Sequence, residues 1–261
     1  MSRLRLSFGS TISKDDDTGE TVVALSPIAS AVGGVGCTLP GAGNDDSFSL
    51  SEEHQLFALS DGASESYDSG LWSKILCLQW VAGGGVASRP SLYARIRDYN
   101  DACRVATLSW SKQAAFERGS YATFLGIRRR HGAVQVLAFG DSLAVWHHGD
   151  RAVTFPYCSA EQFDERPLCL STVQVRNEPA LAAVRVSYTT WPMETGSSLL
   201  LMTDALGRWL LSQREARVAR ERLLRLSSAA EFAEFVLSER RAGTMKRDDT
   251  TLAVLSVEAE L

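Results

Sequence analysis

The sequence predicts an α+β fold, a four-layer α-β-β-α sandwich in which two mainly antiparallel sheets lie face to face and helices cover both. Strand-like segments follow one another in runs, whereas a parallel sheet would alternate them with helices. The helix-like segments form two groups, and each group comes after its own set of strands. No segment of the 261 residues has the composition of a linker, so we expect a single domain over residues 1–261.

The first half of the chain is expected to begin with strands and to end in helices. Strands are expected at 4–8 and 21–25, and a hairpin is expected from 47–50 and 56–60. A helix over 65–82 would end at three consecutive glycines. A second helix would start after Pro90-Ser91 and end at Gly119, with one face formed by Leu92, Ile96, Tyr99, Cys103, Ala106 and Trp110.

The second half repeats this order of strands before helices. The expected strands are 121–127 and 133–139, which form a hairpin, followed by 144–147, 152–155, 183–188 and 199–202. Residues 156–180 are expected to be irregular, either as a substrate-facing flap or as a surface loop. Helices are expected over much of 205–241, the last with a capping box of Ser228 and Glu231 and with Gly243 past its end. A strand over 250–257 follows.

The composition is that of a soluble globular protein, with 45% hydrophobic and 22% charged residues. A net charge of −4 argues against nucleic-acid binding. No apolar run approaches the ~18 residues of a membrane helix, and the amino-terminal segment lacks the apolar core of a secretory signal. Five cysteines without a C-x-x-C pair favour reduced thiols over disulfides or zinc. We therefore expect a cytoplasmic protein with no nucleic-acid and no membrane partner.

Aspartates stand at the ends of several expected strands. Asp61 follows the strand FALS, Asp141 follows VLAFG and Asp204 follows LLLMT, whereas Asp46 and Asp248 each precede a strand. Neighbouring antiparallel strands place the start of one beside the end of the other. Asp46 and Asp61 are therefore expected at the same end of their hairpin. Asp204 and Asp248 would share an end if their strands pair antiparallel.

Carboxylates crowded at one sheet edge repel one another and raise each other's pKa. A divalent cation relieves this repulsion, and a set of oxygen ligands without His or Cys favours Mg²⁺ or Mn²⁺ over zinc. An Asp that bridges two ions ~3.5–4 Å apart is the usual device of two-metal phosphoryl chemistry. A single Asp of this kind is explained as well by a turn or a helix N-cap. Four at consistent strand ends favour metal binding.

The ordered set of motifs resembles the metal-dependent Ser/Thr protein phosphatases of the 2C type, as a divergent bacterial-type member. The segment GSYATFLGI is similar to a strand of that family, and the resemblance spans residues 20–257. Each motif alone is weakly specific, whereas the set in this order is strongly specific. The motifs are Asn44-Asp45-Asp46, Asp61-Gly62, Gly140-Asp141-Ser142, Thr203-Asp204-Ala205 and Asp248-Asp249-Thr250-Thr251.

The resemblance implies a two-metal centre at one end of the β-sandwich. By position, Asp61 resembles the ligand that bridges both ions, and the Gly62 carbonyl resembles a ligand of one of them. Asp204 and Asp248 resemble ligands of the first ion. The residues expected to carry catalysis are Asp46, Asp61, Asp204 and Asp248.

The resemblance also implies the remaining ligands and the reaction. Asp46, with Asp45 as a further candidate, resembles the acidic group that serves the second ion through water. Asp141 matches the position that holds a weaker third ion together with Asp204. The implied activity is hydrolysis of phosphoserine and phosphothreonine by a water activated at a binuclear Mn²⁺ or Mg²⁺ centre, without a phosphoenzyme. A phosphorylated protein and a cognate Ser/Thr kinase are the implied partners.

The chain departs from the family pattern near the implied ligands. Family members often carry a phosphate-binding Arg before the first acidic motif, where this chain has Gly41 in the segment LPGAG. Ala205 stands where the family has a glycine, and Ala63-Ser64 replaces a Gly-Gly pair. These departures motivate a second hypothesis, a catalytically weak or inactive pseudophosphatase that acts as a regulatory binding module. Hydrolysis of a small phosphorylated metabolite is a third.

Other prominent residues have simpler explanations. Arg128-Arg129-Arg130 lies at a hairpin turn, and the arginines between 214 and 225 fit a solvated helix face. Four tryptophans fall in expected helices and are predicted to be core residues: Trp72, Trp80, Trp110 and Trp209.

Overall fold

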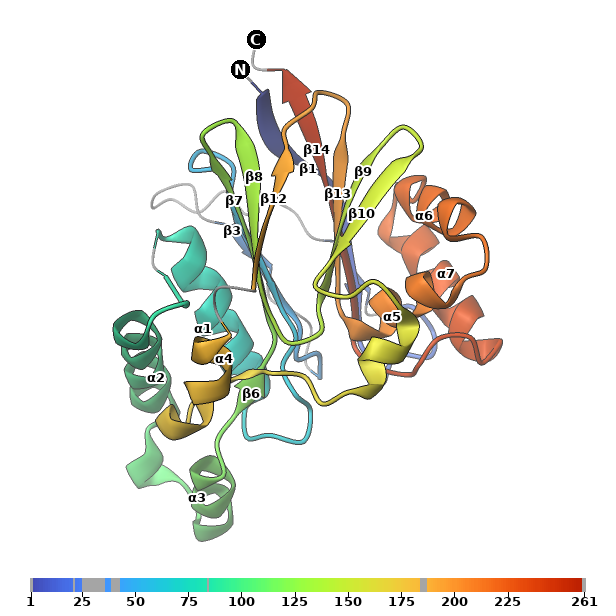
Figure 1. The fold of residues 1–261 in the computed structure, drawn as a ribbon. Coiled ribbons are helices and arrows are strands. Elements are labelled where there is room, and N and C mark those ends of the chain that lie inside the picture. Colours follow the sequence, from blue (N-terminus) through green and yellow to red (C-terminus); the bar gives the residue numbers. More distant parts are fainter. Residues whose placement is uncertain are drawn as a thin grey trace.

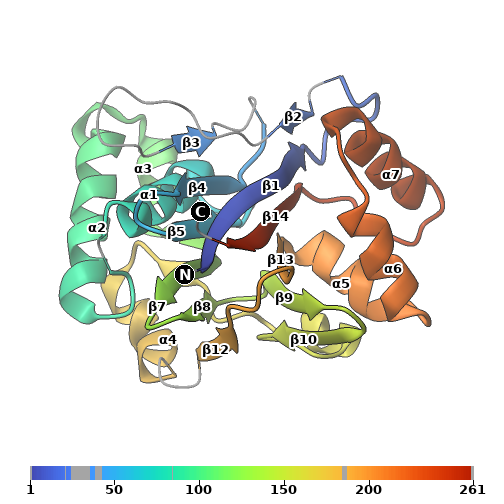
Figure 2. The same ribbon diagram turned by 90° about the horizontal axis from the view of Figure 1, so that it is seen from above.

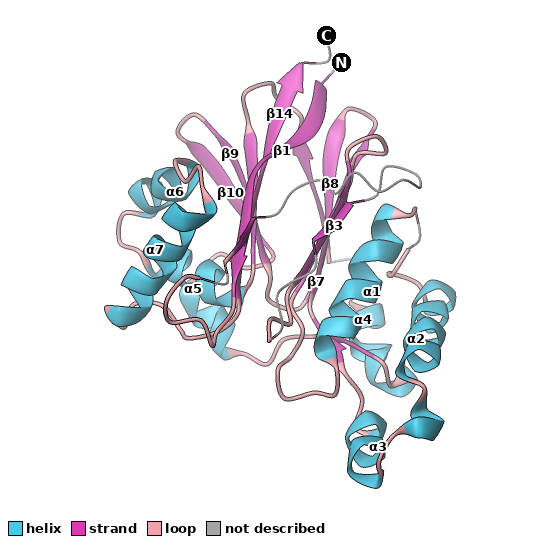
Figure 3. Cartoon of the chain, turned by 180° about the vertical axis from the view of Figure 1, so that it is seen from behind, coloured by secondary structure: helices cyan, strands magenta, loops and turns pink. Residues whose placement is uncertain are grey.

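A computed structural model describes residues 2–20, 22–24, 36–38, 43–83, 85–183 and 187–259. Two six-stranded antiparallel sheets lie face to face, and helices cover the outer face of each sheet (Figures 1 and 3). The predicted four-layer arrangement is confirmed. Seen from above, α1 and α2 lie on one side of the two sheets, and α5 to α7 lie on the other (Figure 2).

The first sheet has the strand order β10-β9-β13-β14-β1-β2. β14 (Thr250–Ala259) pairs with β1 (Ser2–Ile12) along its whole length and with β13 (Ser198–Met202) on its other side. The two ends of the chain therefore lie side by side at one end of the sandwich (Figure 1). The edge strands are β2 (Val23–Ala24) and β10 (Arg151–Phe155), and β9 (Leu143–His148) lies between β10 and β13.

The second sheet has the order β12-β8-β7-β5-β4-β3. Its strands are β3 (Gly36–Thr38), β4 (Ser47–Ser51), β5 (Leu56–Ser60), β7 (Phe124–Arg130), β8 (Ala133–Phe139) and β12 (Tyr188–Pro192). β4 and β5 form the predicted hairpin, as do β7 and β8. β6 (Tyr121–Ala122) leaves this sheet and pairs with β11 (Leu170–Ser171).

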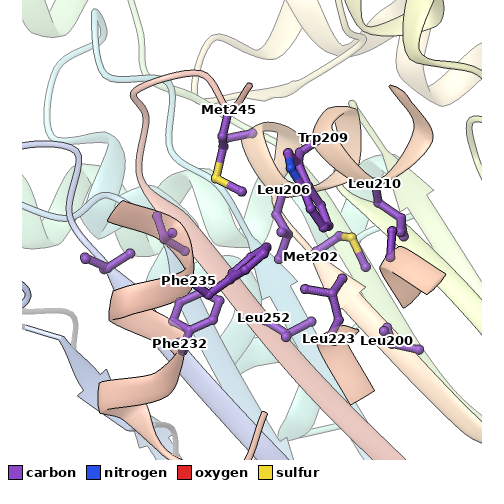
Figure 4. Close-up of a cluster of buried hydrophobic side chains, with 14 of the residues drawn as sticks. Leu200, Met202, Leu206, Trp209, Leu210, Leu223, Phe232, Phe235, Met245 and Leu252 are labelled. Atoms are coloured by element: carbon purple, nitrogen blue, oxygen red, sulfur yellow. The ribbon is translucent and has the colours of Figure 1, made fainter. Parts of the chain in front are cut away.

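The apolar run of β13 shows why both faces of the first sheet are buried. Leu199 and Leu201 belong to the core between the sheets, whereas Leu200 and Met202 pack against helices. This follows from the alternation of side chains along a strand. The helices on that side are α5 (Asp204–Ser212), α6 (Ala216–Leu224) and α7 (Ala229–Arg241), which contribute Trp209, Leu223 and Phe235 among others (Figure 4).

On the second sheet, α1 (Ser69–Val81) and α2 (Arg89–Cys103) form the matching layer. Trp72 and Trp80 of α1 are buried there, as predicted, together with Tyr99 of α2. The ring of Trp72 packs edge-on against Tyr99, with 5.8 Å between the ring centroids. Burial of such large rings stabilises the contact between helix and sheet.

The helix predicted between Pro90 and Gly119 is wrong in its second half. α2 ends at Cys103, and Arg104 adopts a left-handed conformation with φ of 45°. A 3₁₀ turn (Val105–Thr107) and a separate helix, α3 (Trp110–Glu117), follow. The change of direction carries Trp110 away from the core, and its side chain is 84% exposed, contrary to prediction.

Other boundaries shift by a few residues. α1 begins at Ser69 rather than at 65, after a turn with Asp68 at φ of 46°. The strand predicted at 183–188 starts at Tyr188 instead, since Ala183 ends α4 (Glu178–Ala182) and 184–186 lie outside the described residues. Residues 21 and 25 of another predicted strand, and Gly41, also lie outside them.

The predicted capping box is half present. Ser228 accepts a hydrogen bond from the Glu231 N–H, but the Glu231 carboxylate accepts from Ser227 rather than from the cap. The segment 156–180 contains two 3₁₀ turns (Ala160–Asp164 and Gln174–Asn177) besides β11 and the start of α4. Within the described ranges, the structure has no helix of the length and apolarity that crossing a membrane requires.

Candidate metal centre

Strand register brings the predicted aspartates to one end of the sandwich, opposite the chain termini. In the β4–β5 hairpin, the first residue of β4 pairs with the last of β5, so Asp46 and Asp61 flank the same end. β13 and β14 pair antiparallel, with Met202 opposite Leu252. Asp204 and Asp248 therefore also flank one end of their strands.

Asp61 is the centre of this group. Burial raises the pKa of the Asp61 carboxyl well above its usual range, and the charges of Asp46, Asp204, Asp141 and Asp248 each raise it further. Effects of this kind require charges that are close together in a weakly solvated site. The structure thus brings Asp46, Asp141, Asp204 and Asp248 close to Asp61.

Asp46 is the most deeply buried of the five, with 1% of its surface exposed. Its Oδ2 accepts hydrogen bonds from the hydroxyls of Thr251 at 2.6 Å and Thr203 at 3.2 Å. Its Oδ1 is buried and has no hydrogen-bond partner in the described part of the chain. Burial, and then the charge of Asp249, raise the pKa of Asp46 well above its usual range. A buried carboxylate oxygen without a partner is costly unless a cation compensates it.

Asp204 and Asp248 each present one oxygen to the site. The Oδ1 of Asp204 accepts from the backbone N–H of Ala205 at 2.6 Å, and the Oδ1 of Asp248 accepts from the N–H of Asp249 at 3.0 Å. Burial raises the pKa of Asp204; the charge of Lys246 opposes this increase, and Asp248 adds to it. The Lys246 ammonium contacts both carboxylates.

Asp141 follows β8 after a glycine that no other residue could replace without strain. Gly140 has φ of 86°, and a Cβ there would lie 2.8 Å from Cγ2 of Thr123. The hydroxyl of Thr123 accepts from the Asp61 N–H at 3.0 Å and lies 2.7 Å from the Ser142 hydroxyl. Burial, and then the charge of Asp204, raise the pKa of Asp141 to about 6.

Several polar residues that were not predicted from the sequence hold the aspartates in place. The Asp249 carboxylate accepts from the backbone N–H groups of Asp45 at 2.7 Å and Lys14 at 2.8 Å, so it joins three chain segments. A chain of hydrogen bonds runs from the Asn44 amide through Thr11 and Thr251 to Asp46. The threonines next to Asp204 and Asp249 were the available signal, because hydroxyl groups beside a predicted carboxylate can orient it.

The donor set fits a hard divalent cation. The set consists of carboxylate oxygens, and one of them, Oδ1 of Asp46, is buried without a partner among the described residues. Five carboxylates face only two neighbouring ammonium groups, those of Lys246 and Lys14. Among the residues that the structure describes, no three His, Cys, Asp or Glu side chains stand close enough to hold one ion as they are. Binding of a cation at this site would therefore require side chains to move.

Gly62 lies in a space without room for a side chain. A Cβ there would lie 2.8 Å from the Ser69 carbonyl and 2.9 Å from the Asp45 carbonyl oxygen, both of them backbone groups. We expect Gly62→Ala to destabilise the metal-free protein by about 2 kcal/mol, because backbone beside Asp61 must shift. Urea denaturation in EDTA measures this.

The matched control is Gly85→Ala. Like Gly62, Gly85 does not have a positive φ, and a Cβ there would meet only the Ser91 side chain, at 3.5 Å. This variant therefore adds the same methyl group without the close contact with backbone. Equal or greater stability of Gly62→Ala, compared with the unmodified protein, would contradict the packing argument.

A cavity of 1140 Å³ opens beside the aspartates. Its walls come from 63–68, 115–121 and 166–180, and they carry Arg118, Arg166 and Arg176. Cys169 also lines the cavity, and burial, followed by the charges of Asp141 and Asp61, raises the pKa of its thiol. The irregular segment therefore lies next to the candidate site, as the flap alternative requires.

No family model and no curated protein matches the sequence. Solved structures do match. The catalytic domain of the serine/threonine protein phosphatase PstP, in complex with two manganese ions, is 17% identical, with a TM-score of 0.56 over 99% of this chain and 100% of that one. The phosphatase PstP/Ppp of Mycobacterium tuberculosis is 18% identical, with a TM-score of 0.53 over 86% and 97%. A bacterial serine phosphatase is 15% identical, with a TM-score of 0.50 over 87% and 98%. The chain has the fold of these phosphatases.

Proposed function

We propose that this chain, whose fold is that of bacterial serine/threonine phosphatases, is a divergent 2C-type phosphatase. It would hydrolyse phosphoserine and phosphothreonine in proteins with the help of Mn²⁺ or Mg²⁺. One observation carries the proposal: four aspartates from four strand ends surround Asp61, and the buried Oδ1 of Asp46 has no partner among the described residues. A divalent cation would stabilise these clustered carboxylates by compensating their negative charge.

In this proposal, two ions are held by Asp46, Asp61, Asp204 and Asp248 with the Gly62 carbonyl, and Asp141 offers a third position. The bound cations would supply Lewis acidity for a water and charge neutralisation for the phosphate. The chain's own residues orient the ligands. The hydroxyls of Thr203 and Thr251 fix Asp46, and the N–H groups of Ala205 and Asp249 fix one oxygen each of Asp204 and Asp248.

The proposal requires no nucleophile from the protein. Cys169 lines the cavity, and burial together with the charges of Asp141 and Asp61 raises the pKa of its thiol. A thiol with a raised pKa carries little thiolate at neutral pH and is a poor nucleophile. This supports direct hydrolysis without a phosphoenzyme.

The cavity supports a protein substrate over a small metabolite. Its 1140 Å³ exceeds the range of ~300–1000 Å³ that is usual for small-molecule sites. The exposed apolar side chains of Leu168 and Val175 lie on its wall with three arginines, which suits a phosphorylated peptide segment. The phosphate on such a segment would come from a Ser/Thr kinase, which we propose as the functional partner.

The test is hydrolysis of phosphoserine and phosphothreonine peptides by the purified chain. We expect Mn²⁺-dependent release of phosphate that EDTA abolishes and that added Mn²⁺ restores. A panel of small phosphorylated metabolites should be hydrolysed more slowly than the peptides. Phosphate release that is indifferent to the chelator would refute the metal mechanism, and faster release from a metabolite would refute the substrate class.

One observation favours the second candidate, an inactive regulatory module. The Lys246 ammonium already neutralises part of the charge of Asp204 and Asp248. A pseudophosphatase would use such a lysine in place of a metal. Hydrolysis of no phosphoester under any metal condition, with the chain folded, would support this alternative over the phosphatase.

A further inference from the structure

Lys246 lies between two of the carboxylates that the proposed function assigns to the first metal. Its Nζ donates to Oδ2 of Asp204 at 3.2 Å and lies 2.6 Å from Oδ2 of Asp248. The lysine comes from the loop between α7 and β14, two residues before Asp248. The same short loop therefore delivers both the carboxylate and its counter-ion.

The oxygens that Lys246 contacts are the ones a metal would need. The other oxygen of Asp204 is bonded to the Ala205 N–H, and the other oxygen of Asp248 to the Asp249 N–H. Each Oδ2 is thus the oxygen left for an external cation, and one ammonium contacts both. A divalent ion shared by Asp204 and Asp248 would compete with Lys246 for the same two atoms.

The rest of the cluster is different. The buried Oδ1 of Asp46 has no hydrogen-bond partner in the described ranges. In that part of the chain, the Asp61 carboxylate likewise accepts no hydrogen bond, although four carboxylates raise its pKa. The Lys246 ammonium thus compensates the negative charge of Asp204 and Asp248 and leaves the charge of Asp46 and Asp61 without a contacting cation in the described residues.

We infer that Lys246 is a built-in competitor for the divalent cation at Asp204 and Asp248. Occupancy of this pair by a metal requires the ammonium to withdraw, so the lysine sets the metal concentration at which the pair fills. Its side chain is 55% exposed, and ion pairs of such lysines are weak. A divalent ion can therefore displace it, and the withdrawn side chain can extend into solvent.

The inference rests on the proposed function, because it takes Asp204 and Asp248 as metal ligands. It is tested by calorimetric titration of Mn²⁺ into the metal-free full chain and into Lys246→Met. We expect Lys246→Met to bind Mn²⁺ roughly 10-fold more tightly, since the displaced ion pair no longer opposes binding.

Lys14→Met is the matched control. Lys14 is also a lysine beside the cluster, 3.7 Å from Oδ2 of Asp45, but it contacts a carboxylate outside the Asp204–Asp248 pair. Lys14→Met therefore removes the same charge without removing the competition for Asp204 and Asp248. Its effect on Mn²⁺ affinity should be at most about 2-fold, because Lys14 acts on that pair only at longer range, where salt screens the interaction. An equal effect of the two variants, or no effect of Lys246→Met, would overturn the inference.

A second measurement follows the lysine itself. The chain has four lysines, so NMR of the protein after reductive ¹³C-methylation gives few signals, and Lys246→Met assigns the one in question. Titration with Mg²⁺ should shift the Lys246 signal over the same concentrations that saturate the calorimetric binding. A Lys246 signal that does not move while Mg²⁺ binds would overturn this inference but not the proposed metal site. Absence of Mn²⁺ and Mg²⁺ binding in all variants would overturn the metal site of the proposed function as well.

Discussion

Asp61→Asn is expected to lower kcat/KM for a phosphopeptide at least ~1000-fold and at the same time to stabilise the metal-free protein. Asp61 is the carboxylate whose pKa is raised by burial and by four other aspartates. The proposed function makes it the ligand shared by both ions, so its loss removes the metal centre. In the absence of metal, the same carboxylate only adds repulsion, and an uncharged isostere removes that cost.

The two halves of this expectation are measured separately. Phosphate release with Mn²⁺ reports activity, and urea denaturation in EDTA at pH 7.5 reports stability. Asp17→Asn is the matched control, because Asp17 is exposed and pairs with Arg247. It should change neither quantity appreciably. Near-normal activity of Asp61→Asn would exclude the bridging role, and a loss of stability in EDTA would exclude the electrostatic account.

The metal-free protein is expected to become more stable as the pH falls from 7.5 to 5. Burial and the charge of Asp204 raise the pKa of Asp141 from 3.8 to about 6, and the pKa values of Asp46, Asp61 and Asp204 are raised as well. A folded state with raised carboxyl pKa values binds more protons than the unfolded state. The bound protons therefore contribute fully to the free energy of unfolding at a pH below the carboxyl pKa of the unfolded state. This contribution is lost as the pH rises through the carboxyl pKa of the folded state.

The Asp141 shift of about two pKa units corresponds to ~3 kcal/mol over the whole titration. About 1.4 kcal/mol of this falls between pH 7.5 and pH 5, because the unfolded pKa of 3.8 lies below that interval. Urea denaturation in EDTA at pH 5 and at pH 7.5 measures it. Asp141→Asn should remove part of the difference between the two pH values. Saturating Mn²⁺ should reverse the trend, since metal binding requires ionised carboxylates and is favoured by higher pH. Lower stability of the metal-free protein at pH 5 than at pH 7.5 would contradict the prediction.

Local patterns were sufficient for most of the strands, but not for the one expected at 183–188, and for the helices within 205–241. The hairpin of β4 and β5 follows from two apolar runs about a polar turn, and its bounds agree within a residue. The antiparallel pairing of β13 and β14, which the sequence left conditional, is present. The break between α2 and α3 was missed, because Arg104 in a left-handed conformation carries no sequence signal of the kind that glycine provides.

The sequence by itself determined the order of strands and helices, and hence which aspartates stand at strand ends. Their spacing along the chain is a local property, and antiparallel pairing converts it into a common end of the sandwich. Only the tertiary structure decided what surrounds each carboxylate. Asp46 is buried without a partner for Oδ1 among the described residues. The hydrogen bonds of Asp46 and Asp249 and the ion pairs of Lys246 join residues that are up to 235 positions apart. Such contacts depend on how the two sheets and their loops pack together, and the pattern of any one segment does not encode them.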